Sequence, residues 1–455
     1  MKIQLILTLT FAIFFLKINA QSAKSEVLPT QAQLDWADAE IGILIHFDMP
    51  VFKPEYEWRR DMGKHPDASV FNPTQLSTDQ WIEAAKAAGA KYAVLVAKHC
   101  SGFSLWPTKA HEYNISKSPY KNGEGDIVKE FVASCKKYGL KPGIYASTTA
   151  NGYLQVDNPG KVISGNPEEQ KRYNKIVEKQ ITELWTNYGE LFEIWFDGGV
   201  LPVEKGGFDI LSMVEKLQPK AIAFQGPFGY TNNIRWVGNE EGFAPYPCWA
   251  RADSTTSASG VIEIKGLNGN PNGKFWCPGE SDFPIRNNNS FQGGWFWHAG
   301  EDNKLFKLEE LMDKYKKSVG RNTNMLLGVV VDNRGLVPDA DVKILNEFGE
   351  KIKHDFSNPL ASVHGSGAEL TLSFAKPQIV NHLVIMEDIK NGERVRKFEI
   401  LGKKGDKWIS LGSGSCIGHK YIHQFKNTEL SAIRLNIQEY SDIPLIKNLS
   451  VYNID

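Results

Sequence analysis

Four polar side chains stand at the ends of apolar runs in the first half of the chain. They are His46, His99, Tyr145 and Asp197. If the runs form parallel strands of a barrel, their carboxyl ends meet on one face, which brings these side chains together. Each alone has an ordinary structural explanation, such as a hydrogen-bonded buried histidine or an aspartate that caps a turn before glycine. Four in succession predict a functional site.

Two carboxyl groups in this region have aromatic surroundings. Asp197 follows Glu193-Ile194-Trp195-Phe196 and precedes two glycines, whereas Glu280 ends the block Trp276-Cys277-Pro278-Gly279-Glu280. We expect Glu280 to lie in a loop where desolvation raises its pKa, as a general acid at neutral pH requires. With no nucleophilic serine motif and no metal-binding spacing in the sequence, the two carboxyls favour glycoside hydrolysis over a non-sugar hydrolase.

The elements that would position these residues alternate between strands and helices. Continuous apolar runs at 41–47, 92–97, 140–146, 191–196, 221–224 and 325–331 are typical of strands buried on both faces. Helical patterns lie between them, at 78–89, 127–138, 168–188, 210–217 and 305–319. The alternation predicts a (β/α)8-type barrel, with a doubly wound open sheet as the alternative. No G-x-G-x-x-G follows an early strand, which weakens a dinucleotide-binding fold.

The pattern changes after about Lys353. Apolar residues then alternate with polar ones, as in Leu370, Leu372 and Phe374, and turn residues separate the runs. This is typical of a small antiparallel β-sandwich. The sequence therefore predicts a catalytic barrel over 21–353 and a sandwich over 354–455 that supplies no catalytic group, joined by a link that contains Ser357-Asn358-Pro359.

Eight blocks follow one another along the chain: Gly42-Ile43-Leu44-Ile45-His46, Lys98-His99, Gly102-Phe103-Ser104-Leu105-Trp106-Pro107, Gly143-Ile144-Tyr145, Trp195-Phe196-Asp197-Gly198, Arg235-Trp236-Val237-Gly238-Asn239-Glu240, Trp276-Cys277-Pro278-Gly279-Glu280 and Val319-Gly320-Arg321-Asn322. Through these blocks the chain resembles glycoside hydrolase family 29, the α-L-fucosidases, over about residues 33 to 350. The tail is similar to the discoidin-type sandwich often appended in that family.

The resemblance implies a retaining exo-glycosidase that hydrolyses terminal α-L-fucose. It implies that Asp197 is the nucleophile and Glu280 the acid/base. It also implies a sugar pocket, without metal or cofactor, that is lined by His46, His99, Tyr145, Glu57, Trp58 and the aromatic wall Trp295.

One block departs from the family pattern. Where the family usually reads Lys-His-His-Asp-Gly-Phe, this chain has Cys100 and Ser101 in place of the second His and the Asp. A thiol is a weak hydrogen-bond donor and acceptor, so the contact to a sugar hydroxyl is altered. We therefore expect galactose-like sugars to be tolerated beside fucose, and a catalytically weak, lectin-like glycan-binding protein remains the alternative.

Composition and the N-terminus limit the partners. Lys plus Arg is 52 and Asp plus Glu is 53, so the net charge of −1 gives no support for a nucleic-acid partner. Residues 1–20, with Lys2 before an apolar run, are typical of a secretory signal and are too short to span a membrane. We expect cleavage after Ala20, a secreted or periplasmic protein that does not insert in the membrane, and a glycan partner. The 5 cysteines show no pairing pattern.

Overall fold

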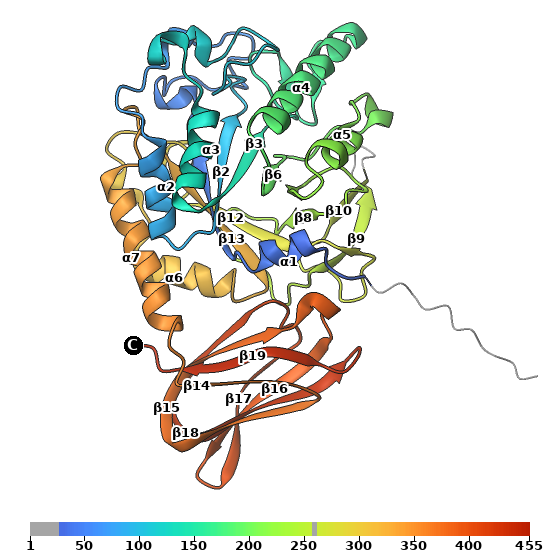
Figure 1. Cartoon of the computed structure of the whole chain (residues 1–455), viewed down its shortest axis with the longest axis vertical. Coiled ribbons are helices and arrows are strands. Elements are labelled where there is room, and N and C mark those ends of the chain that lie inside the picture. Colours follow the sequence, from blue (N-terminus) through green and yellow to red (C-terminus); the bar gives the residue numbers. More distant parts are fainter. Residues whose placement is uncertain (1–26, 257–261) are drawn as a thin grey trace, which may run out of the picture.

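The computed structural model describes residues 27–256 and 262–455. The expected signal segment, residues 1–20, lies outside the described residues. Within the described ranges, parallel strands close a barrel (Figure 1). In order around the barrel these are β1 (Ile41–His46), β13 (Thr323–Val330), β12 (Gly279–Pro284), β8 (Asn233–Trp236), β7 (Ile222–Phe224), β6 (Glu193–Trp195), β3 (Lys141–Ala146) and β2 (Tyr92–Lys98). This confirms the barrel and excludes the doubly wound open sheet.

Helices cover the outside of the barrel, and their sequences explain where they begin and end. Asp126 caps α3 by accepting a hydrogen bond from the amide of Lys129, and Gly139 ends it in the left-handed region with φ of 77°. The expected helices at 127–138 and 210–217 are found at those bounds. The helices are α1 (Gln31–Ala37), α2 (Thr78–Ala87), α3 (Ile127–Tyr138), α4 (Pro167–Asn187), α5 (Ile210–Leu217), α6 (Leu308–Lys317) and α7 (Asp339–Phe356).

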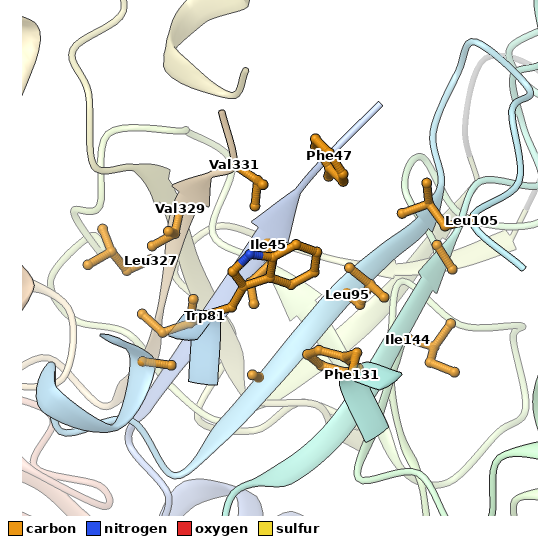
Figure 2. Close-up of a cluster of buried hydrophobic side chains, with 14 of the residues drawn as sticks. Ile45, Phe47, Trp81, Leu95, Leu105, Phe131, Ile144, Leu327, Val329 and Val331 are labelled. Carbon is orange, nitrogen blue, oxygen red and sulfur yellow. The ribbon is translucent and has the colours of Figure 1, made fainter. Parts of the chain in front are cut away.

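Alternate residues of each barrel strand face opposite sides, because side chains alternate along a strand. In β2, Leu95 points outward into the layer between strands and helices, where it joins Trp81 of α2 and Phe131 of α3 (Figure 2). Val94 points inward and fills the barrel lumen together with Trp195 of β6. The lumen is therefore a packed second core, and the two ends of this core are chemically different.

The connection from β7 to β8 contains no helix among its described residues. Residues 225–232 link the two strands directly, and a small antiparallel sheet lies beside β8. That sheet has the order β10 (Ile262–Lys265), β9 (Arg251–Thr256), β11 (Phe275–Trp276). A two-stranded hairpin of β4 (Val156–Asp157) and β5 (Lys161–Val162) follows β3.

The C-terminal part is an antiparallel β-sandwich, as expected. Bulges near Ser373 in β15 allow the sheet to bend around a core that contains Leu383 and Ile433. Helix α7 ends at Phe356, three residues beyond the expected domain boundary at 353. The likeness to discoidin domains stays a prediction. The strands are β14 (Ala361–Ser366), β15 (Glu369–Glu387), β16 (Val395–Lys404), β17 (Lys407–Gly414), β18 (Tyr421–Tyr440) and β19 (Leu445–Tyr452).

The sandwich packs against the end of the barrel where the strands begin (Figure 1). Glu40, directly before β1, forms an ion pair with Lys420 of the sandwich. The buried carboxylate of Glu393 accepts hydrogen bonds from Asn322 Nδ2 at 2.5 Å and from the amide of Ala250 at 2.9 Å. These contacts of the sandwich therefore lie at the opposite end of the barrel from the carboxyl ends of the strands. In the described ranges no helix combines the length and the apolar character needed to cross a membrane.

Candidate active site

Asp197 lies at the carboxyl end of the barrel, two residues beyond β6. Tyr145 of β3 donates its hydroxyl proton to Asp197 Oδ2 at 2.8 Å. Burial raises the pKa of Asp197, and the hydrogen bond from Tyr145 opposes that shift. Thr149 Oγ1 donates to the Asp197 carbonyl at 2.8 Å, and Gln225 Oε1 accepts from the Gly198 amide at 2.9 Å. Gly198 has φ of 72°, so the chain can turn sharply after the carboxylate.

Two histidines and Tyr145 form a wall beside Asp197. The rings of His99 and Tyr145 stack with centroids 5.8 Å apart, and His46, which ends β1, lies 5.9 Å from His99. Burial lowers the pKa of His99 to about 4 and that of His46 well below its usual range. Both imidazoles are therefore neutral at physiological pH, and a neutral imidazole carries one hydrogen-bond donor and one acceptor.

Trp295 borders this wall at His46 and contacts a further carboxylate. Its ring lies 4.8 Å from His46 and covers β13 at Gly328, where a Cβ atom would be 2.4 Å from the indole. Trp295 Nε1 donates to Oε2 of Glu240 at 2.9 Å. Glu240 is exposed and stands four residues beyond β8, so its carboxylate lies at the same end of the barrel as Asp197.

The position of Glu280 corrects the sequence expectation. It lies in strand β12 rather than in a loop, and its side chain is 0% exposed. Its two carboxylate oxygens accept hydrogen bonds from Tyr92 Oη and Trp195 Nε1, each at 2.9 Å. Tyr92 is the first residue of β2, so this carboxyl lies near the start of the strands. Asp197 is four residues beyond the start of β6, which is about 13 Å along a strand. Glu280 thus faces the enclosed end of the lumen and is not available to a leaving group at the open end.

Glu280 has a second carboxyl beside it. Glu193, the first residue of β6, lies within hydrogen-bonding reach of Glu280, and its Oε2 accepts from Trp36 Nε1 at 3.2 Å. Burial raises the pKa of Glu280 to about 7 and that of Glu193 well above its usual range. Two carboxyls in contact without water avoid mutual repulsion by sharing a proton. Trp36 covers the end of the lumen where the strands begin, and its hydrogen bond to Glu193 connects it to the barrel wall.

A third lumen carboxyl, Asp282, lies two residues closer to the open end than Glu280. It is 2% exposed, and Trp236 Nε1 donates to its Oδ1 at 2.6 Å. Burial raises its pKa well above the usual range, and the negative charge of Glu240 adds to the shift. Asp282 was not expected from the sequence. Its contact supports Trp236, the last residue of β8, from which the chain continues to Glu240.

Cys100 lies beside Asp197, whereas Ser101 contacts a different carboxylate. Side-chain atoms of His99, Cys100 and Asp197 that could bind a metal lie within 4.8 Å of one another. Burial raises the pKa of the Cys100 thiol, which keeps it protonated and makes it a poor metal ligand. Ser101 instead donates to Oδ1 of buried Asp48 at 2.6 Å. A carboxylate is therefore present next to position 101, but it comes from the segment after β1.

Glu57 and Trp58 lie at the edge of this region rather than in its wall. The Glu57 carboxylate accepts hydrogen bonds from the amides of Arg59 and Arg60, which fixes the local turn. A Cβ atom at Gly152 would be 3.0 Å from the Trp58 carbonyl oxygen, and the Gly152 amide bonds to the Cys100 carbonyl. The turn therefore packs on the segment that follows β3, next to Cys100.

Sequence reasoning missed Glu240, although it belongs to a block that carries the family resemblance. The signal that could identify it is positional. Glu240 follows a strand end, as Asp197 does, but β8 is only four residues long and two of its residues are polar. The runs used to find strands therefore passed over β8.

Comparisons with known proteins agree with this geometry. The α-L-fucosidase family model matches residues 16–355. α-L-Fucosidase 1 of Arabidopsis thaliana is 33% identical over 93% of this chain and 87% of its own length. A solved structure from Bacteroides thetaiotaomicron is 38% identical, covers 94% of this chain and 100% of its own, and superposes with a TM-score of 0.87. A glycoside hydrolase 29 family member from an unknown rumen bacterium is 30% identical over 94% of this chain and 78% of its own, with a TM-score of 0.80. The chain therefore belongs to the α-L-fucosidase family, glycoside hydrolase family 29, and is a glycoside hydrolase.

Proposed function

We propose that this protein is a retaining exo-glycosidase that releases terminal α-L-fucose from glycans by double displacement. The observation that carries the proposal is the arrangement of two carboxylates at the open end of the barrel. Asp197 is held by Tyr145, and Glu240 is held by Trp295 across the wall that contains His46.

Asp197 is the nucleophile in this proposal. Its hydrogen bond from Tyr145 occupies Oδ2, which leaves Oδ1 to attack the anomeric carbon of the sugar. The attack forms a glycosyl ester with Asp197 and breaks the bond to the leaving group. The same tyrosine stabilises the carboxylate when water later hydrolyses this ester and releases it.

Glu240 replaces Glu280 as the proposed acid/base. A retaining enzyme needs this group to protonate the leaving oxygen and then to take a proton from water. Glu240 is exposed, so it can exchange protons with solvent, whereas Glu280 is enclosed. The indole N–H of Trp295 fixes one oxygen of Glu240 and leaves the other for the glycosidic oxygen.

The proposed sugar is a 6-deoxy sugar of galactose configuration. Neutral His46 and His99 can bond its hydroxyls, and the flat face of Trp295 provides an apolar surface for its methyl group. Cys100 supplies a weaker contact than an imidazole would, so we also propose that galactose-like sugars are tolerated.

The test is a screen of chromogenic glycosides followed by NMR of the first product. We expect hydrolysis of an α-L-fucoside above β-D-galactoside and other sugars, and the α-anomer of fucose should appear before mutarotation. Initial release of the β-anomer would refute retention. Fucose binding by calorimetry without turnover of any glycoside would favour the lectin-like alternative.

We also propose that the protein is exported. The support is the charged and then apolar sequence of residues 1–20. Sequencing of the mature N-terminus should begin at Gln21, and a cytoplasmic protein that keeps Met1 would refute export.

A further inference from the structure

A groove of about 550 Å³ begins beside the proposed nucleophile. Gly198 and Gly199, which follow Asp197, form one edge, and Trp236 and Gly238, which lead to Glu240, form another. The groove therefore lies between the ends of β6 and β8. Residues of the β7 to β8 connection, including Phe228, also line the groove, and the absence of a helix from the described connection leaves this space open.

The wall of the groove is apolar and exposed. Among the large hydrophobic side chains that the structure describes as exposed, four line it: Val203 at 59%, Phe228 at 40%, Ile262 at 43% and Leu267 at 52%. Leu201 and Phe208 add further apolar surface. Soluble proteins seldom leave such side chains clustered unless the surface binds something.

Two charged groups of the wall are occupied within the protein. The Arg235 guanidinium donates to the carbonyls of Gly266 at 2.9 Å and Trp249 at 2.8 Å, and also to that of Cys277. The Asp209 carboxylate caps α5 by accepting from the amide of Ser212 at 3.0 Å. These groups have little capacity left to recognise the many hydroxyls of a second sugar.

We propose that this groove binds the leaving group of the substrate, and that the leaving group it fits is an apolar aglycone. The inference narrows the proposed substrates from glycans in general to fucosides whose leaving group carries an apolar part. The inference rests on the proposed function, because Glu240 must protonate the oxygen that joins sugar and aglycone. The aglycone then lies on the side of Glu240, over Gly198 and Gly199, where no Cβ atom fills the space. Val203 and Phe228 contact its apolar part.

The test compares methyl and octyl α-L-fucosides with the full-length protein, each below the micelle concentration of the octyl compound. Both leaving groups are alkanols of similar basicity, so the chemical step is alike and only the apolar size differs. We expect kcat/KM for the octyl fucoside to exceed that for the methyl fucoside by at least about tenfold, because several methylene groups leave water.

Two variants locate the effect. Phe228→Ser should reduce the octyl-to-methyl ratio by at least about threefold, and Val203→Thr, which keeps the side-chain shape, should reduce it by about twofold. Neither should alter kcat/KM for the methyl fucoside. Ile379→Thr on the sandwich is the matched control, because Ile379 is 52% exposed and remote from the groove, and it should leave the ratio unchanged.

The outcomes separate this inference from the proposed function. An octyl-to-methyl ratio near one would overturn the apolar leaving-group site while fucoside hydrolysis stands. A high ratio that neither groove variant reduces would do the same. A preference for a fucosyl disaccharide that Phe228→Ser abolishes would assign the groove to a sugar instead. No turnover of either fucoside, under conditions where the protein is folded, would refute the proposed function and this assignment with it.

Discussion

The two ends of the barrel lumen carry similar residues in opposite environments. Glu193 and Glu280 meet at the closed end, where Trp36 and other aromatic side chains cover them. Asp197 and Glu240 lie at the open end, also beside aromatic rings, but Glu240 reaches solvent. Both ends therefore offer a pair of carboxyls and an indole N–H donor.

The difference lies in what the carboxyl oxygens contact. At the closed end, the oxygens of Glu280 are bonded to Tyr92 and Trp195, so the pair holds the strands together. At the open end, the bonds from Tyr145 and Trp295 each involve one oxygen of a carboxylate and leave the other available. Residue type and a raised pKa do not by themselves identify an acid/base, and access to the open end separates the two pairs.

The sharpest way to break this comparison is to neutralise one carboxyl at each end. Asp197→Asn should lower kcat on an activated fucoside by roughly a thousandfold or more, because no covalent intermediate can form. Glu280→Gln should change kcat by less than about threefold, since its amide retains a hydrogen-bond acceptor and can donate to Glu193. Steady-state kinetics with circular dichroism as the folding control measures both. Comparable losses would show that the closed end takes part in catalysis.

A second substitution tests the open-end pair itself. Glu240→Ala should lower kcat/KM by roughly 10²–10⁴-fold on a fucoside with a poor leaving group. The loss should be small with an activated leaving group, and azide should restore turnover of the glycosyl ester. Glu241→Ala is the matched control, since Glu241 is the adjacent exposed glutamate. If Glu240→Ala behaves like this control, the acid/base role lies elsewhere.

The contact between Asp48 and Ser101 gives the next largest effect. Ser101→Asp would place a second buried carboxyl next to Asp48 Oδ1, and we expect it to lower the free energy of unfolding by roughly 2–3 kcal/mol. Ser101→Asn, similar in size but uncharged, should cost less. Adding Asp48→Ser to Ser101→Asp should restore most of the loss, as measured by urea denaturation. An additive double variant would mean that the two positions do not interact.

The pH dependence of stability sharpens the comparison at the closed end. Burial raises the pKa of Glu280 to about 7 from its usual 4.5, so the folded state binds the proton more tightly than the unfolded state. Its contribution to stability is therefore complete below pH 4.5 and is lost as pH rises toward 7. Glu280→Gln cannot ionise, and the fall in unfolding free energy between pH 5 and pH 8 should shrink by roughly 2–3 kcal/mol. An unchanged fall would show that the pair does not titrate in this range.

The smallest expected effect concerns the sugar itself. Cys100→His adds an imidazole beside Asp197 and should raise kcat/KM for an α-L-fucoside relative to a galactose-like glycoside by up to about tenfold. This variant is preferable to a double change with Ser101→Asp, because Asp48 already occupies the carboxylate position. The ratio of the two kcat/KM values is the measurement, and a ratio equal to that of the wild type would make the cysteine neutral for specificity.

How much of the fold could be predicted from the sequence depended on whether both faces of a strand are apolar. β2 is apolar on both faces, and the runs therefore predicted it and the barrel. β12 escaped detection because its lumen face carries Glu280 and Asp282, which are buried through hydrogen bonds rather than by apolar character. Because β12 was not recognised as a strand, Glu280 was expected in a loop.

The candidate site likewise contains features that the sequence predicts and features that only the fold reveals. Asp197 could be predicted because it follows a run and precedes glycines. The contact between Ser101 and Asp48 could not, because it joins segments after two different strands, and only closure of the barrel brings them together. A position-by-position comparison with the family pattern finds no aspartate at 101, although the carboxylate of Asp48 lies next to this residue in the fold.

The docking of the sandwich has a consequence for the order in which the chain matures. Glu393 satisfies the amide of Ala250 and the side chain of Asn322, yet it is synthesised 143 residues after the first of these. The base of the barrel therefore stays incomplete until nearly the whole polypeptide has left the ribosome. A nascent chain that remains open at its base in this way is compatible with the export proposed above, because an exported chain crosses the secretion channel unfolded and assembles on the far side.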